Sequence, residues 1–140
     1  MHERQQFAFL YPAMIIGVAG GATWVALQVF ADFPEFLGLW EMIRLTTACA
    51  FTGGLLAAPL FGWDGHKGFA LALIGGVLAT TVGSMLAVGL VESPSAAPWG
   101  PLMVLAGLLR FPEVGTVWLA LMLAAHAAAL PTNPESCDCP

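Results

Sequence analysis

Four long apolar stretches dominate this chain of 140 residues. They cover residues 7–31, about 43–63, 69–91 and 112–130. A helix needs roughly 20 apolar residues, and at least about 17, to cross a hydrocarbon core of ~30 Å. None of the four stretches carries the polar face of a helix at the surface of a water-soluble protein. The pattern predicts an all-α integral membrane protein, with a single four-transmembrane-helix bundle over residues 1–131.

The composition supports this fold class and limits the partners. The chain is 59% hydrophobic and 9% charged, whereas about a quarter of the residues of an ordinary soluble domain are charged. Its formal net charge is −5 with only four lysines and arginines, so no basic patch can meet nucleic-acid phosphates. We therefore expect the lipid bilayer as surroundings, and other membrane subunits or further copies of the chain as partners.

The first stretch has a second interpretation. Residues 29–31 could pass as a cleavage site, and the stretch would then be a secretory signal. Its uncharged run of 25 residues is much longer than the 7–15 residues of a signal core, and Glu3 stands beside Arg4 in the polar start. We therefore expect the stretch to be retained as a membrane span.

The last stretch is interrupted near its beginning. Residues 101–130 are mostly apolar, but Arg110, Pro112 and Glu113 lie among them. A helix that begins at Pro112 keeps both charges out of the lipid and places Glu113 at the positive end of the helix dipole. Residues 99–111 would then form a short interfacial or re-entrant segment before the last helix. The alternative is one long, kinked helix.

The remaining segments connect the stretches or end the chain. Residues 62–68, a glycine-rich and charged sequence, indicate a tight turn that makes the second and third helices an antiparallel hairpin. Residues 132–140 contain two prolines, and we expect a disordered tail. Cys137 and Cys139 are too few for a metal site, which needs three or four ligands, so no metal is expected.

Small residues recur at four-residue spacing and would lie on one face of a helix. Helices in lipid associate largely through close packing of such faces. The set in the third stretch forms a continuous ridge, whereas the pair in the first stretch could equally arise by chance in a chain rich in glycine and alanine. The residues are Gly75, Ala79, Gly83 and Ala87 in the third stretch, Gly17 and Gly21 in the first, and Ala120, Ala124 and Ala128 in the last.

Few polar side chains are candidates for function. His126 is the one ionisable residue deep in a predicted span. We expect a neutral ring that is hydrogen-bonded to a partner on a neighbouring helix, with proton relay or ligand binding as the alternative. Two pairs, Glu41 with Arg44 and Arg110 with Glu113, are three residues apart at helix ends. They are best interpreted as anchors at the headgroup level.

The sequence contains no phosphate-binding loop, no paired carboxylates and no nucleophile–base pattern, so we expect no catalytic residue, no cofactor and no enzyme. The predicted function is a non-catalytic structural or accessory subunit that packs against partner helices. The alternative is a minimal oligomeric transporter or channel for a small solute, lined by threonines and His126. The expected location is the bacterial inner membrane. Arginines and lysines are evenly divided between the two sides, but Lys67 in its short loop favours cytoplasmic termini.

Overall fold

The computed structural model describes residues 2–31 and 38–130, and 89% of these residues are helical, with none in a β-strand. The predicted disordered tail, with Cys137 and Cys139, lies outside the described residues. The elements are the helices α1 (His2–Ala31), α2 (Leu39–Ala57), α3 (Gly65–Val91), α4 (Trp99–Arg110) and α5 (Pro112–Ala129), with a short 3-10 helix, η1 (Ala58–Leu60), after α2.

Four of these helices are long and apolar enough to cross a membrane, which confirms the predicted all-α fold class and number of long helices. α2 and α3 each begin four residues before the predicted stretches. The predicted stretches were defined by apolar residues and so left out charged ones. Charged side chains such as Glu41 and Lys67 are well tolerated in a first helical turn, so both helices begin earlier. α2 ends at Ala57, two residues before Pro59. Proline disrupts the interior of an α-helix, and the chain continues as the tighter 3-10 helix η1.

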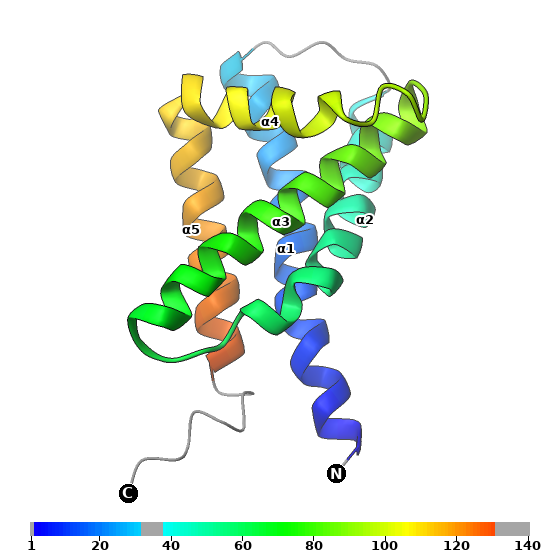
Figure 1. Cartoon of the computed structure of the whole chain (residues 1–140). Helices are drawn as coiled ribbons and strands as arrows, with labels where there is room; N and C mark the ends of the chain where they lie inside the picture. Colours follow the sequence, from blue (N-terminus) through cyan, green and yellow to red (C-terminus); the bar gives the residue numbers. More distant parts are fainter. Residues whose placement is uncertain (1, 32–37, 131–140) are drawn as a thin grey trace, which may run out of the picture.

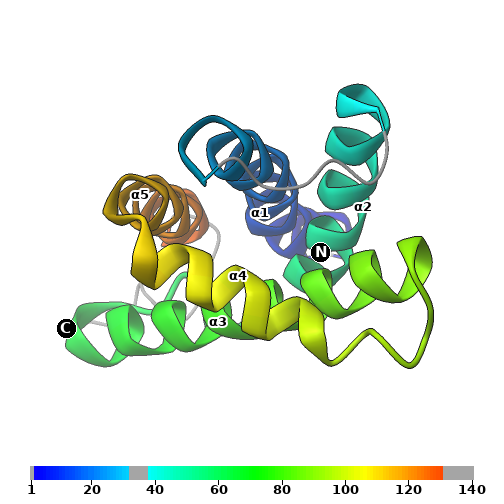
Figure 2. The same cartoon turned by 90° about the horizontal axis from the view of Figure 1, so that it is seen from above.

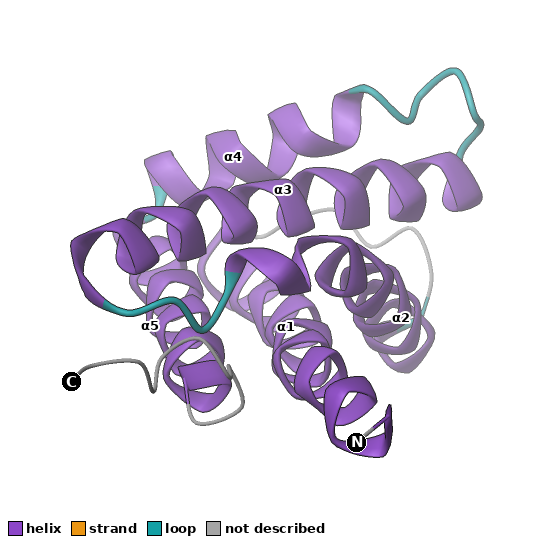
Figure 3. Ribbon diagram, turned by 60° about the horizontal axis from the view of Figure 1, so that its bottom comes forward, coloured by secondary structure: helices purple, strands orange, loops and turns teal. Residues whose placement is uncertain are grey.

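The bundle has one layer of three helices crossed by a fourth. α5, α1 and α2 lie side by side, and α3 runs obliquely across them (Figures 2 and 3). The first turn of α1, the last turn of α5 and the turn between η1 and α3 lie at one end of the bundle, and α4 lies across the other end (Figure 1). This arrangement makes the second and third long helices an antiparallel pair.

A small-residue core joins the layers. α3 meets α2 so closely that a Cβ atom added at Gly83 would lie 3.1 Å from the Cα atom of Ala50. The main cluster of buried apolar residues comes from α1, α2, α3, α5 and the turn that follows η1. Its members are Ile16, Ala19, Ala57, Phe61, Ala72, Ala79, Met122, Ala125 and Ala129.

The buried face of α5 is not the alanine face noted in the sequence. Ala120 and Ala124 are exposed, whereas Val114, Met122 and Ala125 are buried. Because α5 is apolar on all sides, its sequence pattern does not mark which face turns inward. The exposed alanines therefore form a smooth outer strip on this helix.

α4 is a separate short helix, not the first part of one long kinked helix. Phe111, between Arg110 and Pro112, is extended, with φ −116° and ψ 95°. The residue before a proline is pushed out of the helical region by the proline ring, and proline itself suits a first helical turn. With 12 residues, α4 is only about 18 Å long, too short to cross a ~30 Å core.

Candidate functional site

A cavity of about 120 Å³ lies inside the bundle, and all five α-helices contribute to its walls. Part of the wall consists of small residues on α1 and α3, such as Ala19 and Ala79, whose side chains are too short to fill the space. Met122 of α5 and Leu27 of α1 are among its large apolar wall residues. Such a space is a candidate binding site, because small-molecule sites are concave and mostly apolar.

α4 covers one end of this cavity. Gly100 allows α4 to approach α3, since a Cβ atom added there would lie 2.7 Å from the carbonyl carbon of Ser84. Met103 and Val104, on the next turn, belong to the cavity wall. α4, which lies across one end of the bundle (Figure 1), therefore contributes the wall at this end of the cavity.

Hydroxyl groups interrupt the apolar wall. Thr46 donates to the carbonyl of Met42 at 2.8 Å, and Ser84 donates to the carbonyl of Thr80 at 2.6 Å. Thr80 donates to the carbonyl of Gly76 at 2.8 Å. Their protons are engaged within their own helices, as is usual for such residues in helices, so these oxygens retain the capacity to accept a further hydrogen bond.

Thr23 differs from these hydroxyl groups. It lines the cavity, its side chain is only 6% exposed, and its buried Oγ1 atom has no hydrogen-bond partner. Buried polar groups in folded proteins are nearly always paired. A molecule bound in the cavity could therefore form the hydrogen bond that this hydroxyl lacks.

Two tryptophans were not singled out from the sequence as site residues. Trp24 and Trp118 both line the cavity, and the indole nitrogen of Trp118 donates to Thr80 Oγ1 at 2.9 Å. A signal was present, because tryptophan in membrane helices prefers the interfaces, and a buried indole N–H requires a partner. Tryptophan within a predicted span therefore indicates a polar group nearby.

His126 does not line the cavity. It is partly buried near the end of α5, and its Nδ1 atom accepts a hydrogen bond from the backbone N–H of Gly62 at 3.3 Å. The partner thus belongs to the turn between η1 and α3. The prediction of a partner on a neighbouring helix was wrong. The contact joins the end of α5 to the α2–α3 hairpin.

The charged candidates lie in the first two turns of α2, at the end of α4 and in the first turn of α5, and these helix ends are at the α4 end of the bundle (Figure 1). Glu41, Arg44, Arg110 and Glu113 are all exposed. The guanidinium of Arg110 lies 6.0 Å from the centre of the Phe111 ring, within cation–π range. Within the described part of the chain neither pair forms a salt bridge, and the anchoring role at the headgroup level stays a prediction.

The predicted packing residues lie at or near contacts between helices. A Cβ atom added at Gly75 would lie 3.1 Å from Leu60, and Gly83 faces Ala50. Ala79 faces Gly53, and Ala87 belongs to the cavity wall. The two remaining residues face α2, Gly17 toward Phe51 and Gly21 toward Thr47.

No protein-family model, curated protein or solved structure matches this chain. Among the described residues no group of three or more histidines, cysteines, aspartates or glutamates is arranged to hold a metal ion. The cavity instead presents apolar surface, indole rings and hydroxyl groups. This chemistry suits the binding of a neutral molecule.

Proposed function

We propose that this chain is a non-catalytic accessory subunit of a larger complex in the bacterial inner membrane, with both termini in the cytoplasm. Membrane insertion is supported by the outer faces of the long helices. Val18, Leu56 and Ile74, on three different helices, are 64%, 62% and 58% exposed. A soluble monomer rarely exposes contiguous apolar surface on this scale, whereas lipid tails would cover it.

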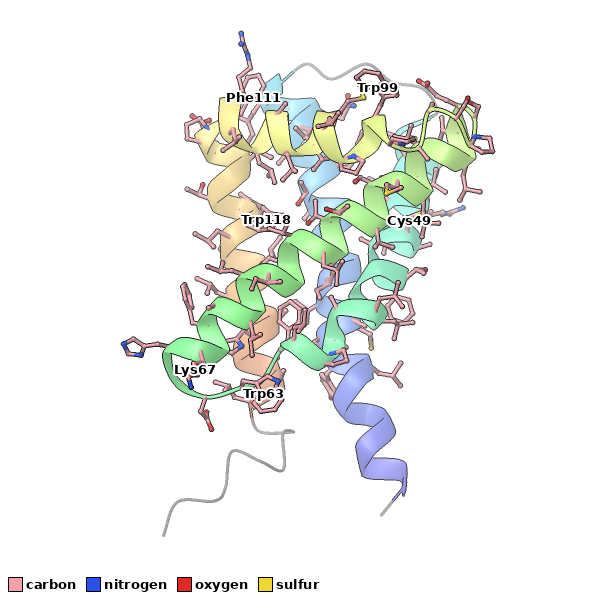
Figure 4. All side chains as sticks on the ribbon, in the orientation of Figure 1. Cys49, Trp63, Lys67, Trp99, Phe111 and Trp118 are labelled. Carbon is pink, nitrogen blue, oxygen red and sulfur yellow. The ribbon has the colours of Figure 1, made fainter. Side chains whose placement is uncertain are left out.

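One observation carries the accessory role, namely the outward face of α4. Trp99, Leu102 and Leu109 are 63%, 58% and 87% exposed, and their spacing of three and seven residues places them on one side of the helix. Figure 4 shows Trp99 on the side of α4 that faces away from the bundle. The opposite side holds Gly100 and Gly107 against the bundle.

The depth of α4 gives this face its meaning. α5 has 18 residues and is therefore about 27 Å long, close to the ~30 Å thickness of the hydrocarbon core. Because α4 ends where α5 begins, its outward face would lie at the headgroup boundary. An interfacial helix normally turns its apolar side toward the acyl chains. Leu102 and Leu109 instead face away from the bundle and would be exposed to water. A partner subunit would bury them.

A second surface fits the same partner. Ala120 and Ala124 on α5 are exposed, and small residues allow the backbone of another helix to approach closely. α5 continues directly from α4, so one partner with a membrane helix and an end domain could cover both surfaces. The proposed interface therefore has an apolar anchor at Leu109 and a smooth alanine strip below it.

Site-specific photo-crosslinking in cells tests this function. A benzoylphenylalanine in place of Leu109 should give one discrete crosslinked species with a different protein, recovered in constant stoichiometry after mild detergent extraction. The matched control is the same group in place of Val18, which is also exposed and apolar but lies on α1, outside the proposed interface, and should capture lipid. Equal, diffuse labelling at both positions would contradict the accessory role.

A second candidate is a minimal oligomeric transporter or channel for a small solute. The observation that favours it is the cavity, whose wall unites Thr23, Thr46 and Thr80 from three helices. Crosslinks between copies of this chain, with no other protein in the purified complex, would favour this candidate over the first.

A further inference from the structure

We propose that the cavity beneath α4 is a binding site for a neutral, mainly apolar molecule that carries one hydroxyl group, an alcohol or a phenol with a single ring or a short chain. This site goes beyond the accessory function and does not depend on it. The inference rests on the volume of the cavity, on the unpaired hydroxyl of Thr23 and on the charges of the wall.

The volume suits a ring-sized group. At about 120 Å³, the cavity is comparable with engineered apolar cavities of about 150 Å³ that bind benzene. Leu27, Met103 and Met122 provide apolar wall, and methionine side chains adapt readily to irregular ligands. A lipid with two full chains would be too large for this space.

Thr23 defines the polar part of the ligand. Its Oγ1 atom is buried and unpaired, and a buried hydroxyl without a partner destabilises a folded protein. Thr23 belongs to the cavity wall, and a threonine in a helix has two accessible χ1 rotamers, so rotation about the Cα–Cβ bond can turn this hydroxyl toward the cavity. There it can donate a hydrogen bond to an oxygen of the ligand.

The other wall hydroxyls require a donor. Ser84 and Thr46 already donate to carbonyls in their own helices, so each can only accept from a ligand. A carbonyl on the ligand would satisfy Thr23 alone, whereas a hydroxyl accepts from Thr23 and can also donate to Ser84 or Thr46. The arrangement therefore favours an alcohol or a phenol over a ketone or a hydrocarbon.

The charges of the wall favour a neutral ligand. In the part of the wall that the structure describes, Glu92 at the end of α3 is the one ionisable residue, and it is exposed. Among the described residues, no cationic side chain belongs to the wall and could hold an anion. An ionised ligand would lose its hydration without gaining an opposite charge inside, which is costly.

Fluorine NMR on the intact protein in lipid nanodiscs tests the site with two probes. 4-Fluorobenzyl alcohol carries the hydroxyl, and 1-ethyl-4-fluorobenzene replaces it with a methyl group of similar shape. We expect a saturable bound resonance for the alcohol, absent from empty nanodiscs, and an affinity about fivefold higher than for the hydrocarbon, as one net hydrogen bond would give. No saturable signal, or equal affinities for the two probes, would overturn the proposal.

A matched pair of variants locates the hydrogen bond. Thr23→Val should lower the affinity for the alcohol about fivefold and leave the hydrocarbon unchanged. Thr52→Val is the control, since Thr52 is exposed and donates to Ala48 at 3.0 Å outside the cavity, and it should change neither affinity. If Thr23→Val melts at a higher temperature but the wild-type protein binds neither probe, the Thr23 hydroxyl is paired only by water. The proposal is then wrong. The comparison of probes on the wild-type protein decides even where a variant does not fold.

Discussion

Trp118 and Thr80 join α5 to α3 through a hydrogen bond of 2.9 Å between the indole nitrogen and Oγ1. The Thr80 hydroxyl in turn donates a hydrogen bond to the carbonyl of Gly76 at 2.8 Å. Met122 packs beside Gly76. The bond lies in the cavity wall. It therefore helps to fix how far apart α3 and α5 stand and how wide the cavity is.

Removal of the acceptor should destabilise the bundle. Thr80→Val leaves the partly buried indole N–H without its partner, and the free energy of unfolding should fall by about 1–2 kcal/mol. Trp118→Phe in the same background should cost less than it does in the wild-type protein, because the bond is already lost. Unfolding in mixed micelles measures both values. Strictly additive effects would show that the bond contributes no stability.

The contact between α2 and α3 should tolerate added volume poorly. A Cβ atom at Gly83 would lie 3.1 Å from the Cα atom of Ala50, so Gly83→Leu must push the two backbones apart, at a cost of about 1–3 kcal/mol or more. Leu86, on the same helix, is 39% exposed, and Leu86→Ala should cost less. Thermal melting in detergent compares the two variants. Equal melting temperatures would contradict the tight contact at Gly83.

The long helices could be predicted from the sequence because a helix that can cross a membrane requires an uninterrupted run of apolar residues. The break before Pro112 could be predicted too, because proline restricts the residue that precedes it. The orientation of α5 could not, since a helix that is apolar on every side does not mark its buried face. The alanines at 120 and 124 were as good a packing face, by pattern, as the buried Met122 and Ala125.

The cavity lay beyond the sequence for a related reason. Its wall combines residues from five helices, and Thr23, Ser84 and Trp118 are separated by dozens of positions along the chain. Only the oblique course of α3 brings them together. His126 shows the same limit, because its hydrogen bond was expected from its polarity but its partner, Gly62 in a turn, depends on where α5 ends.

Two glycines in one turn provide a matched test of how α5 meets the hairpin. Gly62 and Gly65 both have positive φ, 85° and 72°, so alanine should strain the backbone at either position by about 1–2 kcal/mol. A Cβ atom at Gly62 would also lie 2.8 Å from the carbonyl oxygen of Ala129, whereas nothing lies within 4 Å at Gly65. Gly62→Ala should therefore lower the melting temperature further than Gly65→Ala. Identical losses would mean that α5 does not press on this turn.

The side of the membrane on which each end lies can be tested with cysteines. Ser95, between α3 and α4, and Glu113, in the first turn of α5, are exposed near the α4 end of the bundle, and His66, in the first turn of α3, is exposed near the opposite end. Because Lys67 governs the expected orientation, the neighbouring His66 is the better position to change. The single variants Ser95→Cys, Glu113→Cys and His66→Cys would be placed in a chain whose cysteines at 49, 137 and 139 have been replaced.

An impermeant maleimide applied to intact cells should label the cysteines at 95 and 113, and should reach the one at 66 only after the membrane is permeabilised. The first result follows from α4, whose 12 residues are too few to cross the core, so the chain on both sides of α4 stays on one face. The second follows from the positive-inside rule, which serves short loops such as the one with Lys67 best. Arg44 and Arg110 oppose it on the other side, but Glu41 and Glu113 stand near them at helix starts. Labelling of 66 in place of 95 and 113 would reverse the orientation, and labelling of 95 and 113 from opposite faces would make α4 a fifth crossing and overturn the architecture.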